Sequence, residues 1–564
     1  MDIGLVGDGP AVDAVAAALG DVDVNVMPVD AELLDGFDLA VVVATTGSDV
    51  FERADAELDR WVAIEVGGLG GVPLQGVDAG VTIFEDACYD CLRTRVESGG
   101  SEPADRPRGT RSAVRFAGSV AGRRTIQLLA GEEIGDTVSE IPGPERTLLP
   151  VPGCACGPDP EDALPRDHVD RELSASIDRA EQAVDPRIGA LREVGEQESF
   201  PVPYYVAATA DTRAFSDARA AEFAGGVDAD WDAAFMKALG EGLERYAAGV
   251  YRTDGFVEAP AAEVQNPVGP DQFVRPDDAP AYDPEQPLPW VEGERLGTGE
   301  VASLPAEFVH FPPPTDKRYR PAITTGLGLG NSGTEALLSG LYETVERDAT
   351  MTTWYSTTDP LGLDVDDEVF RELTKRARAE GLTVTPLLVT TDVDVPVVAV
   401  GVHRDDEWPN FAAGSGADLD PAAAARAALA EALQNWTELR SMGREGADEQ
   451  SAAIGHHSAF PDETRAFFDP DSTVPLAGLG ESEAAGKAEL EALIDRVCAA
   501  GLEPYAARTT TRDLETLGFE AVRVLVPGAQ PLFTGDPFFG ERARDVPASM
   551  GFEPTLEKAY HPFP

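Results

Sequence analysis

Three glutamates at short spacing are the residues best placed to do chemistry. Glu335, Glu343 and Glu346 lie within residues 326–349, where a glycine-rich turn runs directly into an expected helix. Their offsets of eight and three residues, at about 100° per residue, put the three side chains on one side of that helix. Three carboxylates are therefore expected to face one place.

A second segment upstream repeats this arrangement. Glu241 and Glu244 are again three residues apart, and Arg245 follows them as Arg347 follows the last glutamate of the first segment. We therefore expect two helices, each with a Glu-x-x-Glu-Arg edge.

Grouped carboxylates repel one another, and one of them would become neutral unless cations lay between them. Hard divalent cations such as Mg²⁺ take oxygen ligands and usually keep substrate phosphates in their coordination shell. The spacing therefore favours a nucleotide–magnesium site built from two helix faces. The alternative, from spacing alone, is a pair of amphipathic helices with solvated charges. The sequence contains neither a P-loop motif nor a Gly-x-Ser-x-Gly motif, so neither of those chemistries is indicated.

Four segments in a fixed order resemble the YcaO family. They are the two glutamate helices, the second with its preceding Gly-Leu-Gly-Asn-Ser, followed by residues 420–434 and a late strand at residues 522–532. The similarity covers residues 170–564. YcaO proteins are ATP-dependent enzymes that activate peptide backbone amides. The resemblance implies that chemistry, with ATP and Mg²⁺ as cofactors and a peptide or protein as substrate.

The resemblance also implies roles for individual side chains. ATP and Mg²⁺ would be bound by Glu241, Glu244, Arg245, Asn331, Glu335, Glu343, Glu346, Arg347, Arg426 and Glu431. Of these, Glu343 and Glu346 would also be catalytic. The sequence departs from the family pattern at two positions. Residues 225–227 replace a Gly-Lys-Gly, and Ala427 stands where an arginine is expected, with Arg426 about 100° away round the helix.

The sequence ends in His561-Pro-Phe-Pro564, which by default is a frayed terminus. YcaO cyclodehydratases often end in a proline-rich tail that enters the active site, and the final Pro-x-Pro resembles a shortened form of it. The resemblance therefore implies a catalytic place for Pro564. It also makes His561 the histidine expected nearest the chemistry.

In the reaction that the resemblance implies, a Cys, Ser or Thr side chain of the substrate attacks a backbone carbonyl. Phosphorylation by ATP then makes the carbonyl oxygen a leaving group. The product would be an azoline in a ribosomal peptide, as in bacteriocin biosynthesis. Thioamide formation, with a sulfur donor and a sulfur-transfer partner protein, is one alternative. A SagD-type docking scaffold without turnover is another, although a scaffold has no use for a polyanionic cleft.

The N-terminal segment has the pattern of a small Rossmann-like unit. A strand, a turn with Gly4, Gly7 and Gly9, and a helix precede two further short strands. The glycines come near a dinucleotide-binding fingerprint, but Val12 stands where a third glycine would allow close helix packing. We therefore expect a structural α/β domain, with cofactor binding as the alternative.

Four of the five cysteines form two close pairs, Cys88 with Cys91 and Cys154 with Cys156. Pairs with short spacing in a reducing compartment favour a tetrahedral zinc site over disulfides, and four thiolates leave the metal no open position. We therefore predict a structural Zn²⁺ site. Cys498 lies among apolar residues at helical spacing and is expected to be a core thiol.

A Rossmann-like start followed by a four-cysteine site resembles the ThiF-like domain that is fused to YcaO in azoline-forming cyclodehydratases, the group that includes SagD-type proteins. The region is shorter in this sequence, which suggests that leader recognition needs a separate leader-binding partner. We predict a ThiF-like domain at residues 1–160 and a YcaO ATP-binding catalytic domain at residues 170–564. The expected fold class is α/β and α+β with mixed sheets.

The charge balance is extreme, with 101 acidic against 44 basic residues and a net charge of −57. A field of that sign repels nucleic acid and anionic membranes, and 43% hydrophobic residues argue against disorder. An acidic surface with five lysines is typical of a halophilic protein, because molar salt screens its repulsion over about 3 Å.

No signal peptide or long apolar run is visible, so we expect a cytoplasmic protein. A homodimer would be ordinary for the family.

Overall fold

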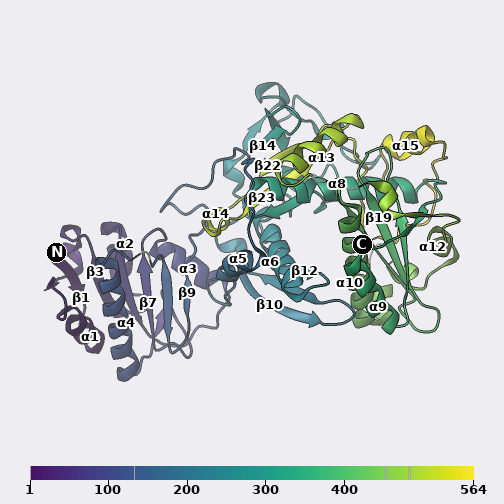
Figure 1. Cartoon of the computed structure of the whole chain (residues 1–564). Helices are drawn as coiled ribbons and strands as arrows, with labels where there is room; N and C mark the ends of the chain where they lie inside the picture. Colours follow the sequence, from purple (N-terminus) through teal and green to yellow (C-terminus); the bar gives the residue numbers. More distant parts are fainter. Residues whose placement is uncertain (1, 133, 451–453, 481, 483, 564) are drawn as a thin grey trace.

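The computed structural model describes residues 2–132, 134–450, 454–480, 482 and 484–563. An N-terminal sheet with its helices lies at one end of the molecule, and a larger region built on three further sheets lies at the other (Figure 1). This arrangement confirms the expected α/β and α+β class with mixed sheets. Among the described residues, no helix combines the length and apolar composition needed to cross a membrane.

The N-terminal sheet has the strand order β2-β1-β3-β4-β7-β8-β9. Its first four members are parallel, and from β4 onward each pair is antiparallel. The sheet is therefore Rossmann-like only in its first half. The strands are β1 (Asp2–Val6), β2 (Asn25–Pro28), β3 (Ala40–Thr45), β4 (Trp61–Val66), β7 (Ala79–Phe84), β8 (Thr137–Ile141) and β9 (Glu145–Thr147), with a separate hairpin of β5 (Gly68–Leu69) and β6 (Val72–Pro73).

Helices cover both faces of this sheet, because alternate strand residues point to opposite sides. In β3, Val41 and Val43 belong to the core under α1 and α4, whereas Ala40 and Val42 belong to the core under α2 and α3. The helices are α1 (Pro10–Leu19), α2 (Val50–Glu57), α3 (Tyr89–Ser98) and α4 (Arg111–Leu129). Strands buried on both faces explain the continuous apolar runs in this part of the sequence.

The larger region contains the sheets β10-β11-β12, β13-β14-β22-β23-β16 with β15 paired to β14, and β20-β19-β18-β17-β21. Their strands are β10 (Leu191–Glu198), β11 (Tyr204–Thr209), β12 (Phe223–Val227), β13 (Val257–Ala259), β14 (Leu288–Arg295), β15 (Glu300–Pro305), β16 (Leu327–Gly330), β17 (Leu361–Asp364), β18 (Thr383–Leu388), β19 (Val397–His403), β20 (Phe411–Ala417), β21 (Thr473–Pro475), β22 (Tyr505–Arg508) and β23 (Glu520–Leu525).

Long helices lie between these sheets, and three of them, α6, α8 and α10, carry the glutamate motifs (Figure 1). The helices of this region are α5 (Leu173–Ala180), α6 (Trp231–Ala248), α7 (Ala306–Val309), α8 (Gly333–Trp354), α9 (Glu368–Ala379), α10 (Pro421–Asp448), α11 (Ile454–Ser458), α12 (Asp462–Phe467), α13 (Lys487–Ala499), α14 (Arg512–Leu517) and α15 (Arg542–Met550).

Cys498 does not lie in the core, contrary to the expectation. Helix α13 buries Leu490, Leu493, Ile494 and Val497, which form one stripe at helical spacing. Cys498 follows the last of them by one residue, a rotation of about 100°, and is exposed. The apolar neighbours in the sequence belong to a different face of the helix.

A buried ion pair joins the N-terminal region to the larger region of the molecule. Arg95 of α3 contacts Asp513 of α14 at 2.5 Å, and both side chains are fully buried. Tyr246 of α6 donates to the same carboxylate at 2.6 Å and accepts from Arg95 at 3.2 Å. The surrounding apolar core is continuous from α3 to α6 and α14. The N-terminal sheet is thus fixed to the helix that carries the first glutamate motif.

We predict that Asp513→Ala lowers the free energy of unfolding by about 3–5 kcal/mol, because it leaves the Arg95 guanidinium buried without its carboxylate. Urea denaturation of the full chain in molar KCl measures the change. Asp366→Ala is the matched control, because Asp366 pairs with Arg371 at an exposed position where loss of the pair costs about 1 kcal/mol or less. Equal losses in the two variants would contradict the assigned role of the buried pair.

Candidate functional site

A glycine-rich strand and a capped helix position the second glutamate motif. Strand β16 leads into α8, whose first turn is capped by the Ser332 side chain, which accepts from the Glu335 N–H at 3.4 Å. The strand lies tight against this helix. A Cβ at Gly328 would sit 2.1 Å from the Ala336 carbonyl oxygen, and one at Gly330 would sit 2.4 Å from the Glu335 Cβ. The glycines of the motif therefore allow the strand to approach the helix.

A cavity of about 490 Å³ lies where α6, α8 and α10 approach one another. Its wall contains Glu241, Glu244, Glu335 and Glu431, so the structure brings carboxylates of three helices together. Further wall residues are Gly225, Gly226, Val227, Met236, Lys237, Gly240, Leu329, Gly330, Asn331, Ser339, Ser415, Ala427, Gln434 and Phe519. Its volume falls within the range of small-molecule sites, about 300–1,000 Å³.

Arg245 braces the two glutamates of α6. Its guanidinium donates to Glu244 at 2.9 Å and to Glu241 at 3.0 Å. Burial nevertheless raises the pKa of Glu244 to about 7, and it also raises the pKa of Glu241. One arginine therefore offsets only part of the cost of burying two carboxylates.

Arg347 lies among three carboxylates on the other side of the cavity. Its nitrogens are 3.9 Å from Glu343, 3.6 Å from Glu346 and 3.7 Å from Glu431. Glu343 and Glu346 are not themselves in the cavity wall. The Ser415 hydroxyl, which is in the wall, donates to Glu346 at 2.6 Å, and its N–H donates to Glu431 at 2.6 Å. Burial raises the pKa of Glu346, and it raises that of Glu431 to about 7.

Asn331 and Glu335 form a separate hydrogen-bonded unit in the wall. Glu335 accepts from the Asn331 backbone N–H at 2.8 Å and from its side-chain amide at 3.0 Å. The Asn331 oxygen accepts in turn from Arg171 at 2.9 Å and from Ser176 at 2.8 Å. The sequence indicated Asn331 but not Arg171 or Ser176, which come from a distant segment and carry no local motif.

Arg426 lies outside the cavity wall. It contacts Asp367 at 2.8 Å and Asp420 at 3.3 Å, whereas its neighbour Ala427 faces the cavity. One residue of rotation on α10, about 100°, separates the two directions. The structure therefore places Arg426 in an ion-pair cluster and gives it no contact with the carboxylate cavity.

Strand β12 brings Gly225 and Gly226 to the cavity in place of the expected lysine. A Cβ at Gly226 would lie 2.0 Å from the Ala238 backbone nitrogen, so this strand packs directly on α6. One turn before Glu241, Lys237 reaches the same wall and contacts Asp228 at 2.7 Å. Lys237 was not singled out from the sequence, because it matches no motif position.

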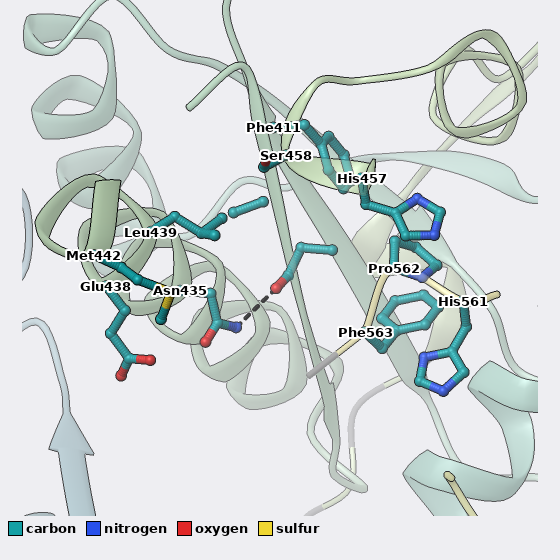
Figure 2. A pocket seen from close by; sticks show the side chains of 12 residues that line it. Phe411, Asn435, Glu438, Leu439, Met442, His457, Ser458, His561, Pro562 and Phe563 are labelled. Carbon is teal, nitrogen blue, oxygen red and sulfur yellow. Dashed lines mark hydrogen bonds between the residues drawn. The ribbon is translucent and has the colours of Figure 1, made fainter. Parts of the chain in front are cut away.

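The C-terminal residues close a second, smaller cavity of about 100 Å³ (Figure 2). His561 and Phe563 line it opposite Asn435 and Glu438 of α10, while the predicted catalytic Pro564 lies outside the described residues. The His561 Nε2 contacts the Phe533 carbonyl at 2.8 Å, and burial lowers the pKa of His561 to about 4. The histidine is therefore neutral at ordinary pH.

The two cavities share elements. Glu431 and Gln434 of α10 face the larger cavity, and the next turn of the helix faces the smaller one. Strand β20 likewise offers Ser415 to the larger cavity and Ala413 to the smaller one. Gln434 links them by donating to Glu438 at 2.9 Å. The smaller cavity therefore adjoins the Glu431 end of the larger one.

The carboxylate set fits a hard cation. Glu241, Glu244, Glu335 and Glu431 share one wall, and burial raises the pKa of Glu241, Glu244 and Glu431 although Arg245 and Arg347 act to lower it. Oxygen ligands of this kind suit Mg²⁺, which binds one or two carboxylates together with substrate phosphates. The donor chemistry and the cavity size together fit a nucleotide with Mg²⁺.

The four paired cysteines form a separate cluster, with all sulfur atoms within 4.8 Å of one another. The Sγ–Sγ distances are 3.7 Å for Cys88–Cys91, 3.4 Å for Cys88–Cys154 and 3.6 Å for Cys91–Cys156. Four ligands at about 2.3 Å from a tetrahedral metal lie about 3.8 Å apart. The donor set and spacing therefore fit a four-thiolate metal site, and Arg512 donates to Cys156 at 3.1 Å from the larger region.

Hydrogen bonds to the backbone position the first cysteine pair. Asp136 accepts from the backbone N–H groups of Glu85 at 2.6 Å and Ala87 at 3.0 Å, which fixes the turn before Cys88. Cys88 is the N-cap residue of α3, and its sulfur accepts from the Cys91 N–H at 3.4 Å. The same helix carries Arg95, so the cysteine cluster and the buried ion pair share one element.

Comparison with known proteins places the cavity within a recognised family pattern. A sequence model of the family described as YcaO cyclodehydratase, ATP- and Mg²⁺-binding, matches residues 225–530. An uncharacterized protein of Methanothermobacter thermautotrophicus is 28% identical over 316 residues, which is 53% of this chain and 79% of the relative. Residues 225–530, which the family model matches, include all the glutamates of the cavity.

Two solved structures share the fold of the whole chain. A heterocyclase in complex with substrate and cofactor has a TM-score of 0.74 and 19% identity, and the match covers 100% of this chain and 85% of that one. The heterocyclase TruD has a TM-score of 0.65 and 17% identity, with 98% and 82% coverage. The N-terminal sheet and the larger region are therefore found together in other proteins.

We predict that a pH titration of stability reports the buried carboxylate Glu244. Its pKa is raised to about 7 in the folded protein from an ordinary value of 4.5, so between these pH values the folded state binds more protons than the unfolded state. In divalent-free buffer, the free energy of unfolding should therefore fall as the pH rises through that window. Glu244→Gln should reduce this fall by about 1–3 kcal/mol, measured by urea denaturation with a chelator present.

The control is Glu258→Gln, which changes an exposed glutamate of β13. Repulsion over the whole acidic surface also weakens the protein at high pH, and both variants share that background. A Glu244→Gln curve parallel to those of the wild type and the control would show that this carboxyl ionises normally in the folded chain.

Proposed function

This chain belongs to the YcaO family of ATP- and Mg²⁺-binding cyclodehydratases, and we propose that it converts Cys, Ser or Thr residues of a ribosomal peptide to azolines. The observation that carries the proposal is the cavity that gathers Glu241, Glu244, Glu335 and Glu431 from three helices. Arg245 contacts Glu241 and Glu244. Arg347 contacts Glu431 together with Glu343 and Glu346, which are not in the wall. A docking scaffold would gain nothing from burying this much charge.

The wall has two chemically different parts. Met236, Leu329 and Phe519 offer apolar surface, which suits the face of a nucleotide base, and the carboxylates form the rest. Lys237 is a cation in the wall and is assigned to the phosphates, in place of the lysine that β12 lacks. When bound, ATP supplies the phosphoryl group, and Mg²⁺ neutralises its charge.

The residues of this chain would position the reacting groups. Glu241, Glu244, Glu335 and Glu431 would hold Mg²⁺, and Arg245 and Arg347 keep the carboxylates in place. The substrate peptide is assigned to the Glu431 end, where the smaller cavity receives an apolar side chain. The substrate thiol or hydroxyl would lose its proton and add to the carbonyl carbon, and the resulting oxyanion would take the γ-phosphoryl group of ATP and release ADP. The C–O bond would then break with loss of the amide N–H proton, so the products are the azoline peptide, ADP, phosphate and one proton.

We further propose that the four cysteines bind one Zn²⁺ in a structural site. Arg512 and the Val151 N–H, which donates to Cys91 at 3.2 Å, stabilise thiolate charge. The site then holds α3 and the loop after β9 together beside α14. We also propose that the chain divides at residues 1–160 and 170–564, as the sequence suggested, and that it works in the cytoplasm at high salt.

The zinc proposal is tested by metal analysis of the purified full chain. We expect about one zinc per chain, with loss of the metal and of thermal stability in Cys88→Ser and Cys154→Ser. Cys498→Ser is the control, because this exposed cysteine lies outside the cluster. Wild-type zinc content in the two cluster variants, or no metal in the wild type, would refute the site.

For the nucleotide site, Lys237→Met should weaken ATP binding in the presence of Mg²⁺ by about tenfold, because one phosphate contact is lost. Calorimetric titration of the two proteins gives the dissociation constants. Lys375→Met removes an exposed lysine of α9 and should bind ATP as the wild type does. Unchanged affinity in Lys237→Met would remove this lysine from the site.

The reaction is tested by incubating the protein with ATP, Mg²⁺ and a pool of synthetic peptides that contain Cys, Ser or Thr between glycines. We expect ADP formation and peptides that have lost one water per ring, both absent in Glu343→Ala. Exchange of oxygen for sulfur, seen only with added sulfide, would replace cyclodehydration with thioamide formation. ATP binding without any turnover would contradict the proposed reaction and favour the alternative of a docking scaffold.

A further inference from the structure

Residues 106–124 break the charge pattern of the chain. This segment contains six arginines and no aspartate or glutamate, in a protein with 101 acidic residues and a net charge of −57. At the average frequency of the chain, a segment of this length would carry several carboxylates. The segment includes most of α4 and the loop that leads into it.

Helix α4 presents these arginines to solvent. Its inner face packs on the sheet and on α1, and a Cβ at Gly118 would lie 2.2 Å from the Ala11 carbonyl oxygen. On the outer face Arg111, Arg115 and Arg123 are exposed, and so are Arg106 and Arg108 in the preceding loop.

Five of the six arginines of residues 106–124 form no ion pair within the described part of the chain. In the described part of the chain, Arg124 contacts Glu145, whereas no ion pair forms to Arg106, Arg108, Arg111, Arg115 or Arg123. Elsewhere on the surface, exposed arginines commonly lie beside carboxylates, as Arg371 lies beside Asp366. The repulsion among these five arginines is therefore not offset by ion pairs within the described part of the chain.

A groove of about 550 Å³ runs between this helix and the β8–β9 hairpin. Phe116 lies on its wall and is 59% exposed, which is unusual for a phenylalanine. Arg123 lines the same groove, and the groove glutamates Glu140 and Glu145 are already paired with other arginines. The groove thus combines an exposed aromatic side chain with Arg123, which forms no ion pair within the described part of the chain.

We propose that this surface binds an acidic segment of the polypeptide substrate, an inference that rests on the amide-activating function proposed above. Arginine and aromatic side chains are the residues that contribute most to binding at protein interfaces. Arginines also hold carboxylates through two parallel hydrogen bonds. Salt weakens such a direct contact less than it weakens long-range attraction between separated charges. The acidic remainder of the molecule repels nucleic acid and anionic lipid, so a polypeptide is the anionic partner that fits.

The position of α4 separates this binding from the chemistry. Figure 1 shows the helix on the N-terminal sheet, away from α6, α8 and α10, the helices whose glutamates line the carboxylate cavity. A segment bound here makes no contact with the reacting amide. The surface therefore sets which polypeptide is held, and the cavity acts on a different part of it.

The test uses a fluorescein-labelled peptide in which Glu-Asp pairs alternate with Leu, and a matched peptide with Gln-Asn pairs. Anisotropy titrations of the full chain are made in about 0.5 M and about 2 M KCl. We expect the acidic peptide to bind at least about tenfold more tightly than the neutral one. Arg111→Glu/Arg115→Glu/Arg123→Glu should abolish the difference, and Phe116→Ala should weaken binding of both peptides.

The matched control is Arg378→Glu/Arg444→Glu/Arg544→Glu, which makes the same charge change at exposed arginines elsewhere. It should bind the acidic peptide as the wild type does. Equal losses in the two triple variants would overturn the proposal. So would a dimer that dissociates only in the α4 variant, because a second copy would then cover the surface. Binding of ATP with Mg²⁺, measured in parallel, stays at the wild-type level and separates this result from failure of the proposed function.

Discussion

The cost of gathering several carboxylates in one partly buried cavity is the constraint on which the rest of the structure depends. Glu241, Glu244 and Glu431 line one cavity, and burial raises the pKa of each of them. Arg245 and Arg347 contact these carboxylates and act to lower their pKa, but the effect of burial is larger. A bound cation would offset that cost further, and the surrounding elements keep the carboxylates in place.

The N-terminal sheet contributes to this support. The cysteine cluster begins α3, the buried Arg95 of that helix binds Asp513, and Asp513 binds Tyr246, which follows Arg245 on α6. A short series of contacts thus runs from the cluster to the first glutamate motif. It gives a physical reason for the two regions to occur together, since the sheet fixes one wall of the cavity without entering it.

Much of the site could be predicted because its motifs are local. Helical spacing placed Glu335, Glu343 and Glu346 on one helix, and α8 carries all three. The cysteine pairs meet as their spacing suggested. Spacing along one helix could not show which glutamates line the cavity, because Glu343 and Glu346 are not among its wall residues and Glu346 instead accepts from the wall residue Ser415.

Long-range contacts and single-residue rotations account for the remaining differences. Arg171 and Ser176 reach Asn331 from a segment with no motif, and Lys237 enters the wall only because α6 lies along it. Arg426 and Cys498 each lie one position away from a residue on the inner face of their helix. That one position is a rotation of about 100°, which turns the side chain away from the cavity in Arg426 and out of the core in Cys498. Antiparallel pairing in the second half of the N-terminal sheet likewise depends on contacts between distant strands.

We propose that the glutamates of separate helices form one magnesium–nucleotide site. The decisive measurement is a titration of the folded protein with ATP in molar KCl, with and without Mg²⁺, in which the wild type is compared with Glu343→Ala and Glu346→Ala. We expect binding that requires Mg²⁺ and is lost in both variants. Binding that is equal without Mg²⁺, or a folded wild type that binds no ATP, would contradict it.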